Sequence, residues 1–264
     1  MARVQSIPWW WLAAGAAALY LLGRAAPLTP AGWVAGAAYL AVAAALLARG
    51  LIRSRAQRFG PANAATAARS ALIGLVTALV VTSLSQPVPP QLLVAVAAPA
   101  LALDAVDGWL ARRTHTESAV GARFDMEVDA FALLALSVGA APLLGWWVLA
   151  IGLMRYVFVA AGWVAPWLTA QLPPRYWRKV VTAACGIALV LAASTLLPTP
   201  AAALGVAAAL ALLVESFGRD VIWLAREAAR LRSPRSPAGR PARSWAGSAR
   251  SRRQGRPGTS RNST

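Results

Sequence analysis

The chain contains eight long apolar runs, and most of the breaks between them contain proline. A helix that crosses about 30 Å of hydrocarbon needs about 20 largely apolar residues. The runs cover 8–23, 31–48, 62–84, 91–111, 119–141, 146–164, 180–197 and 200–222. The breaks hold Pro27 and Pro30, Pro87 to Pro90, Pro142 with Gly145, Pro173 and Pro174, and Pro198 and Pro200. We therefore expect an all-α integral membrane protein with about eight transmembrane helices.

The composition agrees with this expectation. Of the 264 residues, 58% are hydrophobic and 13% are charged, whereas a soluble domain has about 45–50% apolar and about 25% charged residues. This balance excludes an ordinary globular enzyme and a disordered acidic protein. The single cysteine, Cys185, excludes a disulfide scaffold.

Basic residues alternate between the loops, which predicts the orientation of the chain. Basic loops stay cytoplasmic. The first basic loop contains Arg49, Arg53, Arg55 and Arg58, and the second contains Arg112, Arg113 and Arg123. The third contains Arg175, Arg178 and Lys179, and the C-terminal tail is the last basic segment. The opposite loops carry only Arg24. We expect a multi-pass protein of the plasma (cytoplasmic) membrane with both termini inside.

The net charge of +17 is concentrated at the C-terminal end. Residues 228–264 carry ten Arg and no acid, which is +10, and residues 1–227 carry the remaining +7. This Arg-, Ser- and Pro-rich segment lacks the apolar content to fold, so we expect a disordered cytoplasmic tail. It either lies on anionic membrane lipids or is simply solvated, and nothing in it indicates a specific nucleic acid.

The acidic residues are scarce and clustered. Only nine exist, and six of them lie between Asp104 and Asp129. Asp104 and Asp107 share one helix face, and Gly121, Asp125 and Asp129 follow at four-residue steps along the next helix. Two helix faces should thus present four carboxylates to each other. Such a group fits a hard divalent cation such as Mg²⁺; the alternative is a set of salt bridges with Arg112, Arg113 and Arg123.

These residues carry a family resemblance. The pattern Asp104-x2-Asp107-Gly108-x2-Ala111-Arg112-x8-Gly121-x3-Asp125-x3-Asp129 resembles the signature of the CDP-alcohol phosphatidyltransferase family. The resemblance implies a six-helix catalytic core at 61–227. It leaves two additional transmembrane helices and a basic loop at 1–60, and the tail at 228–264. Family members often form homodimers, although no residue here indicates one.

The resemblance also implies roles for single residues. Asp104, Asp107, Asp125 and Asp129 correspond to the metal-binding carboxylates, which usually hold two Mg²⁺ or Mn²⁺ ions, and Asp129 to the base that deprotonates the attacking alcohol. Asp107, Gly108, Ala111 and Arg112 correspond to positions that line the nucleotide site. Glu127 should point away from the Asp125 and Asp129 stripe.

Three groups of residues outside the signature are further candidates. Asn63, Thr66 and Arg69 are similar to an element that lies beside the nucleotide in many family members; the alternative is an ordinary helix start. Arg155, in the middle of the sixth run, should avoid lipid. It binds the acceptor or lipid phosphate, or it pairs with a carboxylate of the signature. Arg219 and Asp220 should form a pair at the membrane boundary.

The expected function is metal-dependent transfer of a substituted phosphate, in phospholipid biosynthesis. Phosphatidyl from CDP-diacylglycerol, or the substituted phosphate of another CDP-alcohol, would pass to a polar alcohol with release of CMP. Glycerol phosphate, inositol phosphate, inositol and serine all fit as acceptors. A Mg²⁺-dependent membrane prenyltransferase is the alternative enzyme, but its acids lie on two distant helix pairs. A non-enzymatic divalent-cation transporter is the alternative outside enzymes, and it gives no reason for Gly108, Ala111 and Arg112.

Overall fold

The computed structural model describes residues 7–54, 61–114, 119–170, 172–173 and 175–232. Over these residues all regular secondary structure is helical, and each of the eight predicted runs forms a helix. The helices are α2 (Ile7–Ala25), α3 (Pro30–Ser54), α4 (Pro61–Ser83), α5 (Pro90–Thr114), α6 (Ala119–Leu144), α7 (Leu149–Val164), α8 (Tyr176–Ala193) and α9 (Thr199–Arg232). Two short 3-10 turns, η1 (Trp146–Val148) and η2 (Pro166–Thr169), flank α7.

Proline residues locate the first residues of three helices more accurately than the limits of the apolar runs do. Helices α3, α4 and α5 begin at Pro30, Pro61 and Pro90, each one residue before the predicted start. Proline lacks a backbone N–H, and the first-turn N–H groups of a helix have no partner within the helix. The proline that separates two runs can therefore also be the first residue of the next helix.

Two predicted boundaries were wrong around proline and serine. Helix α6 continues through Pro142 to Leu144, and the chain turns at Gly145, whose φ is 98°. Helix α8 ends at Ala193, four residues before the predicted end. The Ser194 hydroxyl accepts a hydrogen bond from the backbone N–H of Leu196, and Thr195 adopts a left-handed φ of 55°. Local turn geometry, which hydropathy does not report, sets both ends.

Charged residues extend two helices beyond the apolar runs. Helix α8 starts at Tyr176, so Arg178 and Lys179 lie in its first turn rather than in a loop. Helix α9 continues to Arg232, ten residues past the predicted span and into the segment expected to be disordered. Arg, Lys and Glu are good helix formers. A helix can therefore leave the apolar layer without ending.

Six of the helical segments are long and apolar enough to cross a membrane, so the protein is a multi-pass membrane protein. They are Pro30–Arg53, Ala64–Ser83, Phe124–Leu144, Trp146–Val164, Tyr176–Ala193 and Thr199–Leu231. Among the described residues, helix α5 adds a shorter apolar stretch, Pro90–Asp104. Helix α2, which carries three tryptophans and Arg24, is not among these six segments.

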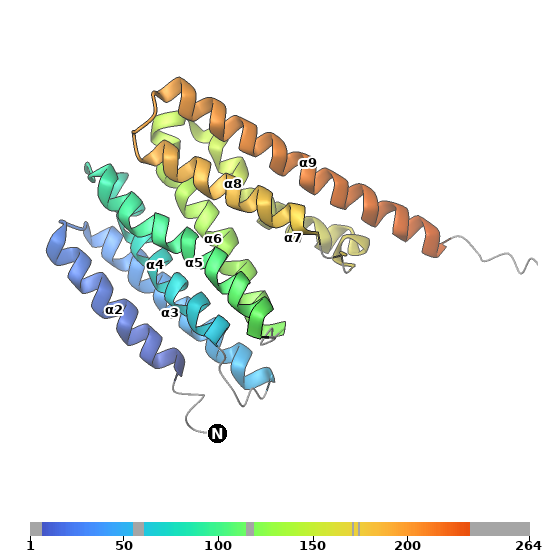
Figure 1. Ribbon diagram of the computed structural model, residues 1–264, viewed down its shortest axis with the longest axis horizontal. Coiled ribbons are helices and arrows are strands. Elements are labelled where there is room, and N and C mark those ends of the chain that lie inside the picture. Colours follow the sequence, from blue (N-terminus) through green and yellow to red (C-terminus); the bar gives the residue numbers. More distant parts are fainter. Residues whose placement is uncertain (1–6, 55–60, 115–118, 171, 174, 233–264) are drawn as a thin grey trace, which may run out of the picture.

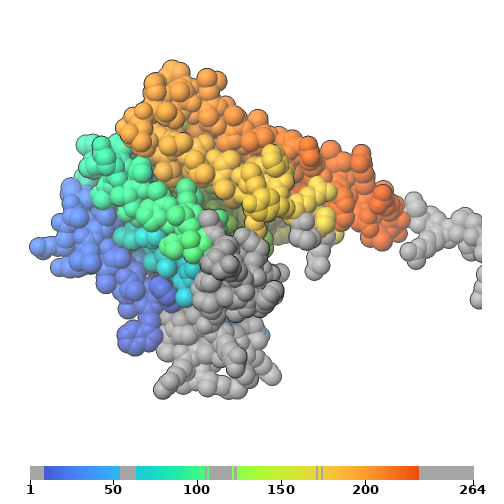
Figure 2. Space-filling model, viewed as in Figure 1, coloured from blue at the N-terminus to red at the C-terminus, as the bar shows by residue number. Residues whose placement is uncertain are grey.

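Helix α4 lies at the centre of the bundle and packs against α2, α3, α5 and α6. Its residues Val76 and Ala78 are completely buried. The N-terminal helices and α8 with α9 lie on opposite sides of the molecule (Figure 1; Figure 2). Helix α6 contacts both groups, since it packs against α3, α4, α7, α8 and α9.

Small residues allow the helices to approach closely, as is common inside membranes. A Cβ atom added to Gly36 of α3 would lie 3.0 Å from the Ala78 Cβ and 3.1 Å from the Gly74 carbonyl oxygen of α4. A Cβ added to Gly152 of α7 would lie 2.4 Å from the Leu134 Cα of α6. These contacts fix α3 against α4 and α7 against α6.

Candidate active site

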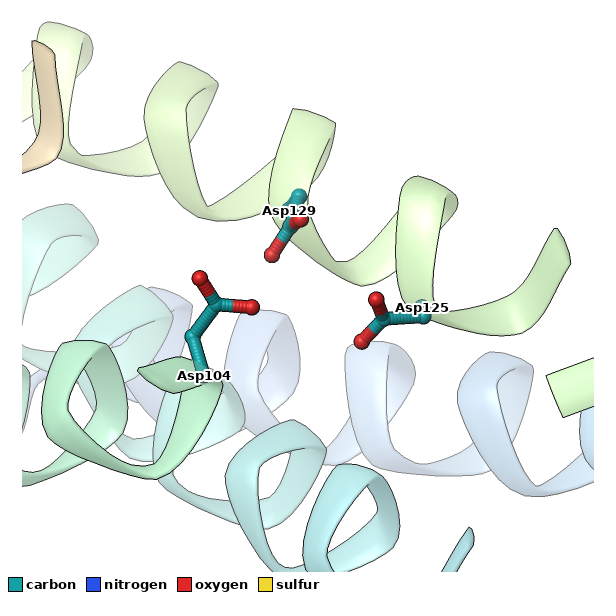
Figure 3. A group of neighbouring side chains, drawn as sticks. All are labelled: Asp104, Asp125 and Asp129. Carbon is teal, nitrogen blue, oxygen red and sulfur yellow. The ribbon is translucent and has the colours of Figure 1, made fainter. Parts of the chain in front are cut away.

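Three carboxylates meet between α5 and α6. Asp104 lies toward the C-terminal end of α5, and Asp125 and Asp129 lie one helical turn apart near the start of α6. Figure 3 shows the three side chains pointing toward one another across the gap between the two helices. One oxygen from each lies within 4.8 Å of the others. The predicted meeting of two acidic helix faces is thus present for these three residues.

Arg69 of α4 lies at the centre of this cluster. Its side chain is only 3% exposed, and its guanidinium pairs with Asp104 through Nη1. Through Nη2 it reaches Asp125 Oδ1 at 2.5 Å and Asp129 Oδ1 at 2.9 Å. The planar fork of arginine suits this task, because its donors point in fixed directions toward several carboxylates at once. The sequence pattern predicted that Arg69 lies beside the nucleotide, and it did not predict these ion pairs with the three aspartates.

The position of Arg69 follows from the packing of α4. The neighbouring Thr66 and Ala67 are also buried, at 5% and 4% exposure. Ala67 belongs to a small apolar cluster that surrounds this end of the bundle and contains Ala43, Leu47, Leu51, Ala67, Ile73, Ala100, Phe124, Val128 and Ala132. A guanidinium placed among such residues requires compensation by opposite charge. The three carboxylates provide it.

The charge balance of the cluster fits a divalent cation. Three ionised carboxylates and one guanidinium sum to a net charge of −2. Each carboxylate remains about one third exposed, at 36%, 31% and 30% for Asp104, Asp125 and Asp129. Oxygen donors in a partly open, negative site are what Mg²⁺ and Mn²⁺ prefer. The residues present therefore suit the metal that the signature implies.

Comparison with known families identifies the chain. The sequence profile described as CDP-alcohol phosphatidyltransferase matches residues 59–216, which is more than half of the protein. The chain belongs to the CDP-alcohol phosphatidyltransferase family. The comparison with curated proteins gave no match, and the comparison with solved structures gave none either.

Membership of the CDP-alcohol phosphatidyltransferase family indicates a phosphotransferase that acts on CDP-alcohols. The matched residues begin two positions before α4 and end within α9. Helices α2 and α3 precede them. The division into two additional N-terminal helices, a catalytic core and a tail stays a prediction.

For several predicted site residues the structure describes the helix but not the surroundings of the residue itself. They are Asn63, Asp107, Gly108, Ala111, Arg112, Arg113 and Arg123. Their helices are described: Asn63 lies in the first turn of α4, and Asp107 to Arg113 lie in the last turns of α5. The predicted roles of these residues, including the alternative salt bridges of Arg112, Arg113 and Arg123, stay predictions.

Arg155 pairs with an acid that the signature does not contain. Its Nη2 lies 2.5 Å from Glu127 Oε1. Glu127 projects from α6 away from the three clustered carboxylates, as predicted, and its side chain is 51% exposed. Arg155 was expected either to bind a phosphate or to pair with a carboxylate of the signature. It does pair with a carboxylate, but that carboxylate belongs to Glu127 and not to an aspartate of the signature. The pair joins α7 to the helix that carries Asp125 and Asp129.

A second ion pair joins α8 to α9. The Nε atom of Arg178 lies 3.0 Å from Oδ2 of Asp220, whose side chain is 8% exposed. Arg219 instead pairs with Glu215 one turn earlier. The predicted pair of Arg219 with Asp220 was therefore wrong. Consecutive residues on a helix point about 100° apart, so Asp220 faces α8 while Arg219 faces outward.

Proposed function

We propose that the protein transfers a phosphatidyl group from CDP-diacylglycerol to a polar alcohol and releases CMP, with Mg²⁺ or Mn²⁺ as cofactor. The observation that carries this proposal is the convergence of Asp104, Asp125 and Asp129 on Arg69. All three acids occupy signature positions. The family membership supports the class of reaction.

We propose the four signature aspartates, Asp104, Asp107, Asp125 and Asp129, as the ligands of the metal. A bound divalent cation supplies positive charge that stabilises the charge developing on the transferred phosphate. Arg69 keeps the carboxylates of α5 and α6 together, since each of its contacts crosses from α4 to another helix. Asn63, Thr66, Gly108, Ala111 and Arg112 are proposed to bind the nucleotide.

Asp129 is proposed as the general base. Its carboxylate accepts the proton of the alcohol while the alcohol oxygen forms a bond to the phosphorus that carries diacylglycerol. The bond between this phosphorus and the bridging oxygen of the diphosphate breaks, and the bridging oxygen leaves with CMP. The pair with Arg69 uses Asp129 Oδ1 at 2.9 Å and thereby orients the carboxylate.

Arg155 is proposed to bind the phosphate of the acceptor or the lipid. Its guanidinium is 29% exposed and has Glu127 as partner. An arginine has five N–H donors, so one carboxylate does not exhaust them. Glu127 would then hold the guanidinium in place.

We also propose that the site and both termini face the cytoplasm, as the basic loops indicate. A single-cysteine assay tests this, starting from Cys185→Ser because Cys185 is the only cysteine. Ala170 and Thr195 are both exposed; Ala170 follows η2 before the start of α8, and Thr195 lies just after the end of α8. In intact cells an impermeant thiol reagent should label Thr195→Cys and not Ala170→Cys. The opposite result would invert the topology.

The experiment that tests the function is an acceptor screen with the purified protein. Labelled CDP-diacylglycerol is supplied with Mg²⁺ or Mn²⁺ and with glycerol phosphate, inositol phosphate, inositol or serine in turn. One acceptor should give CMP and a labelled phospholipid. If none does, a second set of assays measures diphosphate release from isoprenoid diphosphates and metal flux in proteoliposomes. A positive result there would replace the proposal by the prenyltransferase or the transporter.

A further inference from the structure

Tyr39 of α3 contacts two of the three helices that carry the charged cluster, α4 and α6. Its hydroxyl oxygen lies 3.4 Å from the Ser70 hydroxyl oxygen of α4, and Ser70 follows Arg69. Its ring lies on the ring of Phe131 of α6, with centroids 4.6 Å apart and planes inclined by 31°. Phe131 is two residues beyond Asp129. One side chain thus contacts immediate neighbours of both Arg69 and Asp129.

The contacts of Tyr39 differ in strength. An oxygen–oxygen distance of 3.4 Å is long for a hydroxyl hydrogen bond, which is usually 2.5–3.0 Å. The stacked rings are in close contact, and aromatic pairs contribute about 0.5–1.5 kcal/mol beyond the burial of their surface. The ring should therefore position α6 more strongly than the hydroxyl positions α4.

The backbone around Tyr39 is held firmly against α4. A Cβ atom added to Gly74 would lie 2.8 Å from the neighbouring Leu40 side chain and 3.3 Å from Tyr39 itself. At the far end of α3, the Thr29 N–H lies 3.3 Å from the Thr82 hydroxyl oxygen. The Gln86 side-chain amide donates to the Pro27 carbonyl at 2.6 Å. Helix α3 is thus tied to α4 both at its start and near Tyr39.

The charged cluster depends on the distance between α4 and α6. The Arg69 guanidinium lies 2.5 Å from Asp125 and 2.9 Å from Asp129, so a small shift of α6 would lengthen these contacts. Phe131 is on the same helix, within a turn of Asp129.

We infer that Tyr39 is a positioning residue for the carboxylate cluster, so that the N-terminal helices outside the matched family region set the geometry of the metal site. The inference rests on the proposed function, which supplies the metal. Helix α3 then influences the geometry of the metal site and does not serve as a membrane anchor alone. Tyr39 acts through Phe131 and Ser70 and does not touch the metal or the substrate.

The test measures Mn²⁺ affinity by electron paramagnetic resonance on the folded, monodisperse fraction of the full-length protein in detergent. Mutations of groups that orient metal ligands typically cost about 10–100-fold in affinity. Tyr39 is one contact further away, so Tyr39→Leu should weaken Mn²⁺ binding by about fivefold. Tyr39→Phe keeps the ring and should weaken it by no more than about twofold, and adding Ser70→Ala to it should have no further effect.

The matched control is Tyr20→Leu, which changes a tyrosine of α2 that is 58% exposed. It should leave Mn²⁺ affinity unchanged. A merely structural role for Tyr39 predicts a different result: Tyr39→Leu lowers the yield of folded protein or its thermal stability, while the folded fraction binds Mn²⁺ as the wild type does. That result would overturn the inference.

Activity measurements separate this inference from the proposed function. If the wild type binds Mn²⁺ but releases no CMP with any acceptor, the proposed function fails. The ratio of the Mn²⁺ affinities of the wild type and Tyr39→Leu still decides the role of Tyr39. If the wild type is active and Tyr39→Leu binds Mn²⁺ normally, only the inference fails. A wild type that binds no Mn²⁺ overturns both.

Discussion

Arg69 and Asp129 lie sixty residues apart in the chain, yet Nη2 of the arginine is 2.9 Å from Oδ1 of the aspartate. The same nitrogen is 2.5 Å from Asp125 Oδ1. The Arg69 side chain is 3% exposed and the Asp129 side chain 30% exposed, so only the arginine end of the pair is shielded from water. The contact constrains the relative positions of α4 and α6. A residue expected to bind the nucleotide thus also organises the acids.

Replacing Asp129 by Asn should abolish the reaction. The amide has nearly the shape of the carboxylate but cannot accept the proton of the alcohol. General-base catalysis contributes about 10²–10⁴-fold, so CMP release should fall by at least about 100-fold. The control is Glu215→Gln on α9, an acid paired with Arg219 outside the cluster. Full activity of Asp129→Asn would contradict the assigned base.

Replacing Arg69 by Lys should destabilise the protein although the charge is kept. A single ammonium cannot reproduce the two-sided fork that joins Asp104 to Asp125 and Asp129. Because lysine keeps the charge and loses only some of the hydrogen bonds, we expect the free energy of unfolding to fall by about 1–3 kcal/mol. The measurement is thermal or denaturant unfolding in detergent. The control is Arg219→Lys, which is 67% exposed and should change little. Equal stability of both variants would refute a central role for Arg69.

Removal of divalent metal should stop CMP release. Treatment with a chelator should abolish activity, and added Mg²⁺ or Mn²⁺ should restore it, because the site offers carboxylate oxygens and a net charge of −2. Asp104→Asn should raise the Mn²⁺ concentration needed for half-maximal activity by about tenfold or more. Undiminished activity after chelation would exclude the metal.

Replacing Asp220 by Ala should destabilise the packing of α8 on α9. The change leaves Arg178 without its carboxylate in a site where the Asp220 side chain is 8% exposed. Loss of one partner of a buried pair costs about 3–5 kcal/mol. Glu227→Ala removes an acid whose Arg230 partner is 78% exposed, and should cost less than about 1 kcal/mol. The unfolding temperatures of Asp220→Ala and Glu227→Ala, measured side by side, check that Asp220→Ala is the more destabilising change.

Replacing Gly152 by Ala should disturb the contact between α6 and α7. The new methyl group would lie 2.4 Å from the Leu134 Cα, so the helices must separate. Overpacking of this kind costs about 1–3 kcal/mol. Gly205→Ala on α9 is the matched control, since a methyl group there meets nothing within 4 Å. It should be neutral or slightly stabilising, by up to about 1 kcal/mol. Similar unfolding temperatures for the two variants would argue against this packing.

The predicted helices and acidic faces depended on local rules. Apolar runs separated by prolines located all eight helices, and proline itself set the starts of α3, α4 and α5. The spacing of Asp125 and Asp129 placed both on one face of α6, because four residues are close to one helical turn. The same periodicity correctly placed Glu127 on another face.

The partners of the charged residues depended on tertiary packing. Periodicity fixes which residues share a face of one helix, but not which helix that face meets. Arg69 therefore could not be assigned to the carboxylates, nor Arg155 to Glu127, nor Arg178 to Asp220. The adjacent pair Arg219 and Asp220 was misassigned for a local reason, because consecutive residues on a helix point about 100° apart.

By itself, the sequence determined that this protein is a helical membrane protein with an acidic site on two successive helices, because hydropathy and helical period are local properties. The tertiary structure alone decided that Arg69 compensates that site and that Tyr39 of α3 contacts both of its supporting helices. These contacts depend on the close approach of helices through small residues such as Gly36 and Gly74. Their geometry exists only once the bundle is assembled.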